Sequence, residues 1–303
     1  MSSAEVAVQV YRLLTNDDLR VLTVIETGMS KREYVQEGQI ISYTSLSIDK
    51  VSFVLKRLNK MGLIYQKERG YVGHTLNYAG YDCLAINAFV KARAIEAFGK
   101  SLGIGKEADV FDALDAQDSR VAVKFHRLGR ISFRQTKRKR DYLVEHTSWL
   151  FQSRLAAEKE FQALKIAFAN GVAVPKPIKQ NRHAIVMGII EGAELSKYKE
   201  IERPKRVLKE ILKNVRKVYL KAGLVHGDLS EYNIILQPDM HILIIDWPQA
   251  VRVNHPSAQS LLNRDIRNVL VYFKRKYRVS TKTPEVYDYV TGKAKNLTFS
   301  KDE

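Results

Sequence analysis

The stretch from Gly223 to Leu236, GLVHGDLSEYNIIL, constrains the fold of this chain more than any other. Asp228 and Asn233 lie five residues apart in it, and apolar segments flank them on both sides. Such segments are typical of buried strands, where an acid and an amide lose contact with water at a cost in free energy. A fold that holds the two side chains there needs them in a fixed geometry, which is typical of a functional site.

Composition limits the class of protein. The chain has 303 residues, 45% of them hydrophobic, which is enough for one large or two ordinary domains with a sizeable core. Its single cysteine, Cys83, excludes an intramolecular disulfide and argues against a structural zinc site. The N-terminus lacks the pattern of a signal peptide, and no apolar run is long enough to cross a bilayer. These features predict a soluble cytoplasmic protein with no membrane partner.

The net charge is strongly positive. Fifty Lys and Arg residues against 33 Asp and Glu residues give +17. A field of this sign favours polyanionic partners, with nucleic acid first among them. A basic surface that serves only solubility is the alternative interpretation.

The first ninety or so residues predict a winged helix-turn-helix domain over 1–84, followed by a connecting helix over 85–98. A helix over 15–28, capped by Asn16 and ended by Gly28, precedes a short helix at 37–42 and a third helix over 47–62. Two strand-like runs joined by RGYVG follow. The third helix has an apolar stripe of Ile48, Val51, Val54, Leu55 and Leu58. Off this stripe lie Lys50, Phe53, Lys56, Arg57 and Lys60. This basic face fits nucleic-acid reading, and protein binding remains an equal alternative.

From residue 99 onward, strands and helices alternate. The predicted strands lie in 101–114, 120–129 and 183–192, with a hairpin over 233–247 that turns at Pro238 and Asp239. The predicted helices span 153–171, 203–223 and, as the final element, 263–277. The overall expectation is an α+β chain in which a truncated bilobal kinase-like domain, 99–303, follows the winged helix. Its N-lobe would span 99–187 and its C-lobe 188–303.

Four sequence pieces predict phosphoryl transfer. The two glycines of GIGKEADVF, Gly103 and Gly105, would let the backbone approach a phosphate chain. Lys124 lies in an apolar strand and needs an anionic partner. Glu160 on the next helix can supply it, and Glu158 is a competing candidate.

The fourth piece is HGDLSEYN with the IIDW that follows it. Asp228 suits the group that orients or deprotonates an acceptor, and Asn233 and Asp246 suit oxygen ligands for Mg²⁺. The common order of these pieces indicates a kinase-like site. Gly227 stands where ordinary protein kinases have arginine, and Trp247-Pro248 follows Asp246 in place of Phe-Gly. With no A-P-E and about sixty residues after Asp246, an ordinary protein-substrate kinase is disfavoured.

Together these residues resemble the RIO family of atypical kinases, and within it the winged-helix branch, RIO kinase two, in an archaeal form. The resemblance covers nearly the whole chain. It rests on GIGKEADVF, VKFHRLGRISFR, TSWLFQSRLAAEKEF, VPKP, NRHAIVM, HGDLSEYN, IIDWPQ and the N-terminal domain.

The resemblance implies an ATP-dependent serine/threonine kinase or ATPase that uses Mg²⁺, for which Mn²⁺ can substitute. Asp228 would be the catalytic aspartate, with Asn233 and Asp246 holding the metal and Asp246 transiently phosphorylated. Lys124 would bind the nucleotide phosphates with Glu160 as its partner. The remaining nucleotide-binding residues would be Gly103, Gly105, Lys106 and Glu107 at the phosphates and Met187, Gly188 and Ile190 at the adenine. Ala108 stands where relatives usually have serine, and we expect nucleotide binding to survive this change.

The same resemblance implies a role in maturation of the small ribosomal subunit, with its precursor and rRNA as partners. The basic cluster Lys137 to Arg140 would contact rRNA or nucleotide, or form a plain solvated loop. Autophosphorylation would fall on Ser132, Thr136, Thr147 or Ser148. Two other functions stay open: a small-molecule phosphotransferase of the aminoglycoside-kinase type, and an ATP-sensing nucleic-acid-binding regulator. His226 would order the catalytic loop or fill the core.

Overall fold

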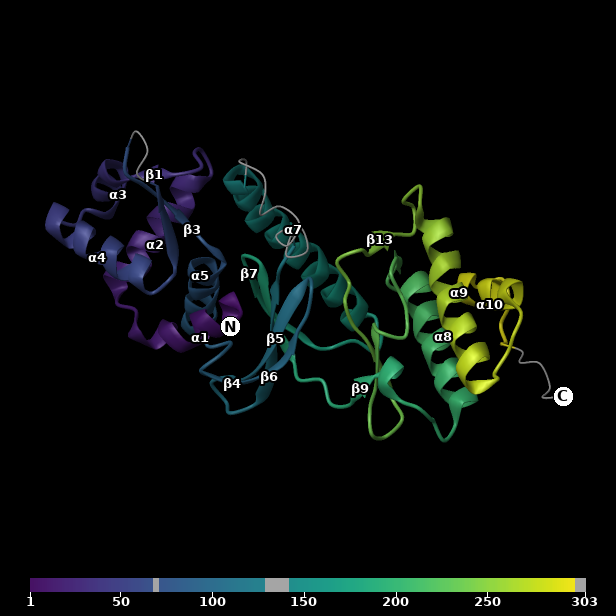
Figure 1. Cartoon of the computed structure of the whole chain (residues 1–303). Coiled ribbons are helices and arrows are strands. Elements are labelled where there is room, and N and C mark those ends of the chain that lie inside the picture. The colour runs from purple at the N-terminus through teal and green to yellow at the C-terminus, as the bar shows by residue number, and fades with distance from the viewer. Residues whose placement is uncertain (68–70, 129–141, 298–303) are drawn as a thin grey trace. The chain divides into compact units, whose positions relative to one another are not determined.

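The computed structural model describes residues 1–67, 71–128 and 142–297, with the backbone alone for 142–148 (Figure 1). This part of the chain divides into two compact units. The first comprises Met1–Ala157 and Lys179–Val186, and the second Glu158–Ile178 and Met187–Glu303. The predicted basic cluster Lys137–Arg140, with Ser132 and Thr136, lies outside the described residues, as do the side chains of Thr147 and Ser148. No helix in the described ranges is long and apolar enough to span a membrane.

The first unit begins with the winged helix, as predicted. Its elements are α1 (Ser3–Val10), η1 (Tyr11–Leu13), α2 (Asn16–Met29), β1 (Val35–Gln36), α3 (Glu37–Thr44), α4 (Ile48–Lys60), β2 (Ile64–Lys67), β3 (Gly73–Leu76) and α5 (Tyr78–Lys91). The strands form an antiparallel sheet in the order β1-β3-β2. Helix α5 is a single helix that crosses residue 84, where the sequence placed the end of the winged helix. Most of its residues are buried, Cys83 among them, because it packs against α1 and α2.

Two details of the winged helix differ from the sequence expectation. Thr15, not Asn16, caps α2, because its hydroxyl accepts from the Asp18 amide while the Asp18 carboxylate accepts from the Thr15 amide. Ile48 is 67% exposed and lies outside the apolar stripe of α4, since only Val51, Val54, Leu55 and Leu58 of that stripe are buried. Ile48 is the first residue of the helix, so it lies beyond the core that the later turns cover.

The basic face of α4 is partly neutralised within the winged helix. Lys50 pairs with Asp17 at 2.7 Å and Arg57 with Asp18 at 3.2 Å, both on α2. Phe53 remains 65% exposed on the same helix. These pairs leave fewer cations on α4 for a nucleic acid than the sequence alone indicates.

The first unit continues with the five-stranded sheet β4-β5-β6-β8-β7, whose β4, β5 and β6 are antiparallel neighbours. Its strands are β4 (Ala97–Ile104), β5 (Ala108–Leu114), β6 (Arg120–His126), β7 (Pro177–Asn181) and β8 (Ala184–Gly188). Inward-facing Phe111, Val123 and Phe125 are buried, and Phe111 meets Phe125 edge to face at 6.1 Å. Helix α7 (Tyr142–Ala169) follows and runs on into the second unit; its residues beyond 157 belong there.

The second unit carries the expected hairpin and helices. Its elements after residue 187 are β9 (Ala193–Glu194), η2 (Leu195–Lys197), α8 (Pro204–Leu220), β10 (Leu224–Val225), β11 (Ile234–Leu236), β12 (Ile242–Ile244), β13 (Val251–Arg252), α9 (Ala258–Tyr277) and α10 (Thr283–Thr291). Buried faces of α8 and α9 form the core beside the short strands. The helix predicted over 263–277 is longer than expected, because α9 begins at Ala258. It is also not the final element, because α10 follows it.

Candidate active site

The predicted phosphate loop connects β4 to β5 in the first unit. The Gly105 amide donates to the Ala108 carbonyl at 2.8 Å and closes the turn. Side chains at Lys106 and Glu107 are exposed, and a Cβ added at Gly103 would meet nothing within 4 Å. The turn therefore exposes its backbone to an approaching ligand, which is what binding of phosphates through N–H groups requires.

Lys124 lies on β6 opposite Val110 of β5, and it is only 9% exposed. Glu160 lies on the part of α7 that belongs to the second unit, and it is 1% exposed, whereas its competitor Glu158 is half-buried. A buried carboxylate and a buried ammonium each need an opposite charge. Burial thus favours Glu160 over Glu158 as the partner of Lys124, and the pairing itself remains a prediction.

The predicted adenine segment starts at the end of β8. Met187 is buried, and the Gly188 amide donates to the Lys176 carbonyl at 2.8 Å. Since that N–H is occupied, Gly188 has only its carbonyl to offer to adenine. Ile190, two residues later, is half-buried in the segment before β9.

The structure brings Asp228, Asn233 and Asp246 together within the second unit. Asp228 is exposed between buried Gly227 and Leu229. The Asn233 side-chain amide donates to the Asp228 carbonyl at 2.8 Å, and the Asn233 carbonyl accepts from the Ile245 amide at 3.0 Å. The first of these hydrogen bonds closes the catalytic loop, and the second connects the loop to Ile245, the residue directly before Asp246.

Asp246 has a left-handed backbone, with φ of 68°. Residues other than glycine adopt this conformation at a cost in free energy, and such residues concentrate at functional sites. The next residue, Trp247, is fully buried and donates from Nε1 to the Ile244 carbonyl at 3.0 Å. The indole that replaces the usual phenylalanine therefore anchors the segment that carries Asp246.

His226 orders this region through both ring nitrogens. Its Nδ1 accepts from the Asp228 amide at 3.3 Å, so its Nε2 carries the proton and donates to the Ile245 carbonyl at 3.0 Å. The ring also meets Trp247 edge to face at 4.6 Å. Of the two roles left open for His226, the structure supports ordering of the catalytic loop by a buried side chain.

Asp265 on α9 is a positioning residue that the sequence reasoning missed. It is buried, and it accepts from the amides of Gly227 at 2.8 Å and Leu229 at 2.9 Å, the residues on either side of Asp228. Burial raises its pKa, against the opposing effects of His226 and these two hydrogen bonds. The only signal in the sequence is an acid within the apolar stripe of a helix.

Gly227 also explains one departure from ordinary kinases. Its φ is 81°, and an added Cβ would lie 2.8 Å from the Gln249 carbonyl oxygen. An arginine at this position would be strained and would clash with the backbone. The loop is therefore held by Asp265 and by a glycine turn, with no arginine at this position.

The donor set fits Mg²⁺ bound together with a nucleotide. Among the described residues, no cluster of three or more His, Cys, Asp or Glu side chains could hold a metal ion unaided. Asn233 and Asp246 offer an amide oxygen and a carboxylate. Mg²⁺ is commonly held by one or two protein oxygens, with substrate phosphates and water completing its octahedron. These two residues could therefore hold Mg²⁺ once phosphate oxygens are present.

A buried ionic cluster lies behind the phosphate loop and joins the winged helix to the five-stranded sheet. Arg127, just after β6, donates to Asp82 of α5 at 2.7 Å and to Asp109 of β5 at 3.2 Å. All three side chains are almost fully buried. The Arg127 amide also donates to the carbonyl of Glu107 in the phosphate loop at 2.6 Å. Arg127 lies in HRLG, part of a motif on which the family resemblance rests. The sequence therefore pointed to this residue, but it did not predict its partners Asp82 and Asp109.

His183 completes this cluster from the turn before β8. It lies 2.6 Å from Asp82 through Nε2 and stacks on Tyr81 at 4.5 Å, while its Nδ1 is buried with no hydrogen-bond partner among the described residues. Protonation would place an unsatisfied N–H at Nδ1 in an apolar site. Burial, aided by the charge of Arg127 and opposed by Asp82, lowers the pKa of His183 to about 4.

This shift predicts a pH dependence of stability. The unfolded chain binds the His183 proton near pH 6.5 and the folded chain only near pH 4, so stability is lost as pH falls between these values. Between pH 7 and pH 5, urea unfolding should show the wild-type losing about 2 kcal/mol more than His183→Gln. Glutamine can still donate to Asp82 but cannot titrate. Equal losses in the two proteins would show that His183 titrates normally.

Comparisons with known proteins agree with this fold. The RIO domain model matches residues 109–286, and the model described as "Rio2, N-terminal" matches residues 11–92. The RIO-type serine/threonine-protein kinase Rio2 of Methanocaldococcus jannaschii is 42% identical over 87% of this chain and 100% of its own length. The serine/threonine-protein kinase rio2 of Schizosaccharomyces pombe is 36% identical over 93% of this chain and 82% of its own.

Solved structures are also similar. The crystal structure of the Rio2 kinase from Chaetomium thermophilum in an ADP/Mg²⁺-phosphoaspartate complex superposes with a TM-score of 0.82 at 33% identity. The match covers 94% of this chain and 88% of that one. The kinase-like fold with an N-terminal winged helix, predicted from the sequence, is confirmed.

Proposed function

This chain belongs to the RIO family of serine/threonine-protein kinases, and from this premise we propose that it turns over ATP with Mg²⁺ through a phosphorylated Asp246. The observation that carries the proposal is that hydrogen bonds of Asn233 join the backbone of Asp228 to Ile245, which precedes Asp246. His226 and Asp265 fix the backbone around Asp228 by further hydrogen bonds. Asn233 and Asp246 hold the metal, for which Mn²⁺ can substitute. The loop at Gly103–Glu107 and Lys124 bind the phosphates, and Met187, Gly188 and Ile190 bind the adenine.

In the proposed cycle, a carboxylate oxygen of Asp246 attacks the γ-phosphorus of ATP. The bond from that phosphorus to the bridging oxygen breaks, and ADP leaves with the electron pair. Water, oriented by Asp228 as it loses its proton, then attacks the phosphorus and releases inorganic phosphate, which restores the carboxylate. A protein hydroxyl in place of water gives Ser or Thr phosphorylation instead. The relative solved as a phosphoaspartate complex supports the first branch.

We place this activity in maturation of the small ribosomal subunit in the cytoplasm, with its precursor rRNA as partner. The support is the family and the net charge of +17, which favours a polyanionic partner. Family membership also favours this assignment over a small-molecule phosphotransferase of the aminoglycoside-kinase type. The ion pairs on α4 weaken the case for a regulator that reads DNA with that helix.

The experiment that tests the proposed chemistry uses γ-labelled ATP and Mg²⁺ with the purified chain. We expect protein-bound label that hydroxylamine removes, accompanied by phosphate release, and we expect both to be lost in Asp246→Asn. Asp239→Asn removes an exposed carboxylate from the β11–β12 turn of the same unit, so it should retain both. Hydroxylamine-stable label on Ser or Thr, unchanged in Asp246→Asn, would reject the aspartyl-phosphate cycle.

A further inference from the structure

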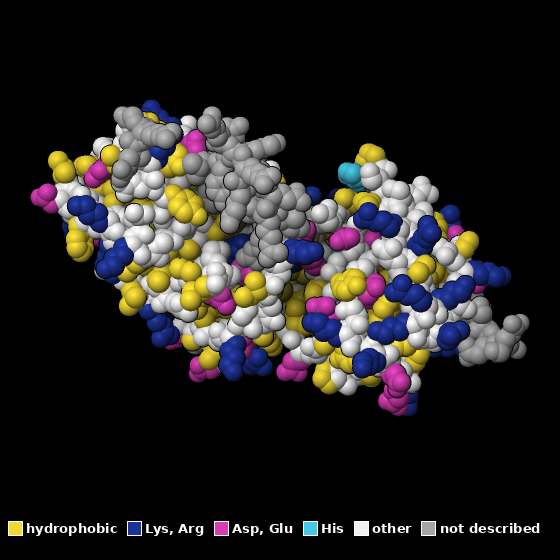
Figure 2. All heavy atoms as spheres, viewed as in Figure 1, with side chains coloured by type: hydrophobic (Ala, Val, Ile, Leu, Met, Phe, Trp, Pro, Cys, Tyr) yellow, Lys and Arg dark blue, Asp and Glu magenta, His cyan; other side chains and the backbone are white. Residues whose placement is uncertain are grey.

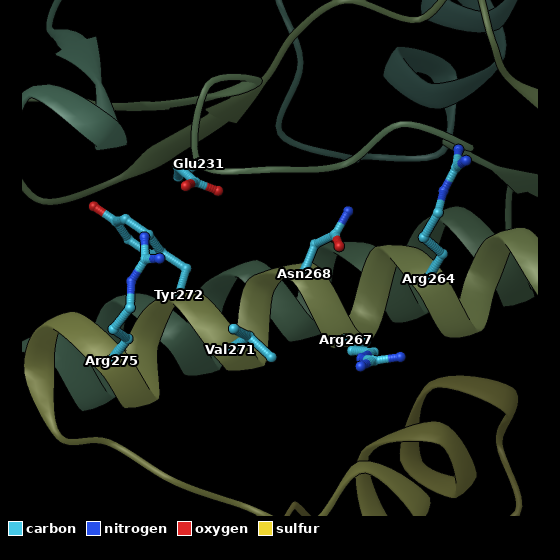
Figure 3. Close-up of a pocket in the computed structure, with 7 residues that line it drawn as sticks. All are labelled: Glu231, Arg264, Arg267, Asn268, Val271, Tyr272 and Arg275. Carbon is cyan, nitrogen blue, oxygen red and sulfur yellow. The ribbon is translucent and has the colours of Figure 1, made fainter.

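One face of α9 forms a cationic groove beside the catalytic loop (Figure 3). The groove has a volume of about 430 Å³, and Glu231 of the catalytic loop lines one side of it. The rest of its lining comes from α9: Arg264, Arg267, Asn268, Val271, Tyr272 and Arg275. Steps of three and four residues place these positions on one face of the helix. Three arginines against one glutamate leave the groove with a net charge of +2.

Part of this face is hydrogen-bonded to the residues on either side of Asp228. Arg264 donates to the Gly227 carbonyl and Asn268 to the Leu229 carbonyl, the latter at 3.1 Å. Tyr272 is buried and donates to the Leu195 carbonyl at 2.8 Å. The groove therefore has a rigid base that is continuous with the loop carrying Asp228.

The other part of this face faces solvent. Arg267 and Arg275 are exposed, and neither makes an ion pair within the described residues. Val271 lies between them and is 52% exposed. The two arginines are eight residues apart, about 12 Å along the helix, which is the span of about four extended residues. They could bind two carboxylates of one extended peptide, with Val271 beneath it.

We propose that this groove binds an acidic segment of a protein substrate and presents a neighbouring Ser or Thr hydroxyl to Asp228. The proposal rests on the proposed phosphoryl transfer and names its acceptor class. Guanidinium groups bind carboxylates through paired hydrogen bonds, which gives such a site both affinity and register. Glu231 disfavours a carboxylate on its own side of the groove and so directs the acids of the peptide toward the arginines.

Single-stranded RNA fits this groove less well. Binding of single strands usually combines cations with exposed aromatic rings on which bases stack. The aromatic residue of the lining, Tyr272, is buried and already hydrogen-bonded. An exposed valine suits an aliphatic side chain of a peptide better than the edge of a base.

The test measures binding by fluorescence anisotropy on the full chain without ATP. The probes are a labelled peptide with one serine flanked by glutamates, its glutamine counterpart, and a labelled uridine oligonucleotide. In Arg267→Gln/Arg275→Gln we expect the affinity for the glutamate peptide to fall by about tenfold or more. The matched control, Lys209→Gln/Lys213→Gln on α8, removes the same charge from exposed positions and should change it by less than about twofold.

Equal weakening by both double variants would overturn the proposal, because it would reveal only a general charge effect. Loss of oligonucleotide binding with unchanged peptide binding in the groove variant would also overturn it and would assign the groove to RNA. Should the double variant unfold, Arg275→Gln alone is compared with Lys213→Gln. Since binding is measured without ATP, groove-dependent binding in a chain that forms no phosphoenzyme would contradict the proposed function and still support the binding of acidic segments by the groove.

Discussion

Replacing Asp228 with Asn should lower phosphoryl transfer, to water or to a protein hydroxyl, by about 100- to 10,000-fold. The amide cannot accept the proton that leaves the attacking hydroxyl, although it keeps the size of the side chain. The fold of the loop should survive, because Asn233 and His226 bond to the backbone of Asp228 and not to its carboxylate. Steady-state phosphate release from ATP and Mg²⁺, together with nucleotide affinity by calorimetry, measures the two effects separately.

The expected pattern is a large fall in turnover with nucleotide affinity changed by little. Asp239→Asn serves as the control, because it removes an exposed carboxylate from the turn between β11 and β12. Turnover within about threefold of wild-type in Asp228→Asn would exclude Asp228 as the group that accepts the proton.

Replacing Arg127 with Met should destabilise the first unit by about 3–5 kcal/mol. Methionine fills a similar space but leaves the carboxylates of Asp82 and Asp109 buried without the guanidinium of Arg127. The same change removes the side chain that joins α5 of the winged helix to β5, directly behind the phosphate loop. Urea unfolding at pH 7 measures the loss of stability.

Arg120→Met, at the first residue of β6, is the matched control. Arg120 pairs with Asp112 at 3.1 Å, but its side chain is about half exposed, so its loss should cost less than about 1 kcal/mol. Adding Asp82→Asn and Asp109→Asn to Arg127→Met should recover part of the stability, because both buried carboxylates of the cluster are then replaced by neutral amides. Equal effects of Arg127→Met and Arg120→Met would show that the buried cluster is not a stabilising unit.

Local sequence was sufficient to predict most helices and strands of the described chain. Apolar periodicity and glycine stops placed α4, α8 and the β11–β12 hairpin, because these signals act within a few residues. Local sequence did not predict details that depend on contacts between side chains. Thr15 and Asn16 are both good caps, and only the side chain of Asp18 selects Thr15. Helix α10 has nine residues, and its buried positions, Val286, Tyr289 and Val290, make a single i, i+3, i+4 set that is too short to identify it.

For the candidate site, the sequence predicted four functional residues: Lys124, Asp228, Asn233 and Asp246. Spacing along the chain was enough, because each lies beside a short apolar strand. Their supporting residues could not be found in this way. Asp265 lies 37 residues beyond Asp228, and Asp82 lies 45 residues before Arg127. Either acid, read in its own segment, is an ordinary helix residue.

Patterns of neighbouring residues were enough to predict the chain's class, its winged helix followed by a kinase-like domain, and its candidate phosphoryl-transfer residues. The order within the site depends on contacts between segments far apart in the chain. Burial favours Glu160 over Glu158 as the predicted partner of Lys124, and it lowers the pKa of His183. Tertiary packing also places Asp265 where its carboxylate accepts from the amides of Gly227 and Leu229 in the catalytic loop. These outcomes depend on the removal of polar groups from water. Tertiary packing causes this removal, and no single segment of the sequence determines it.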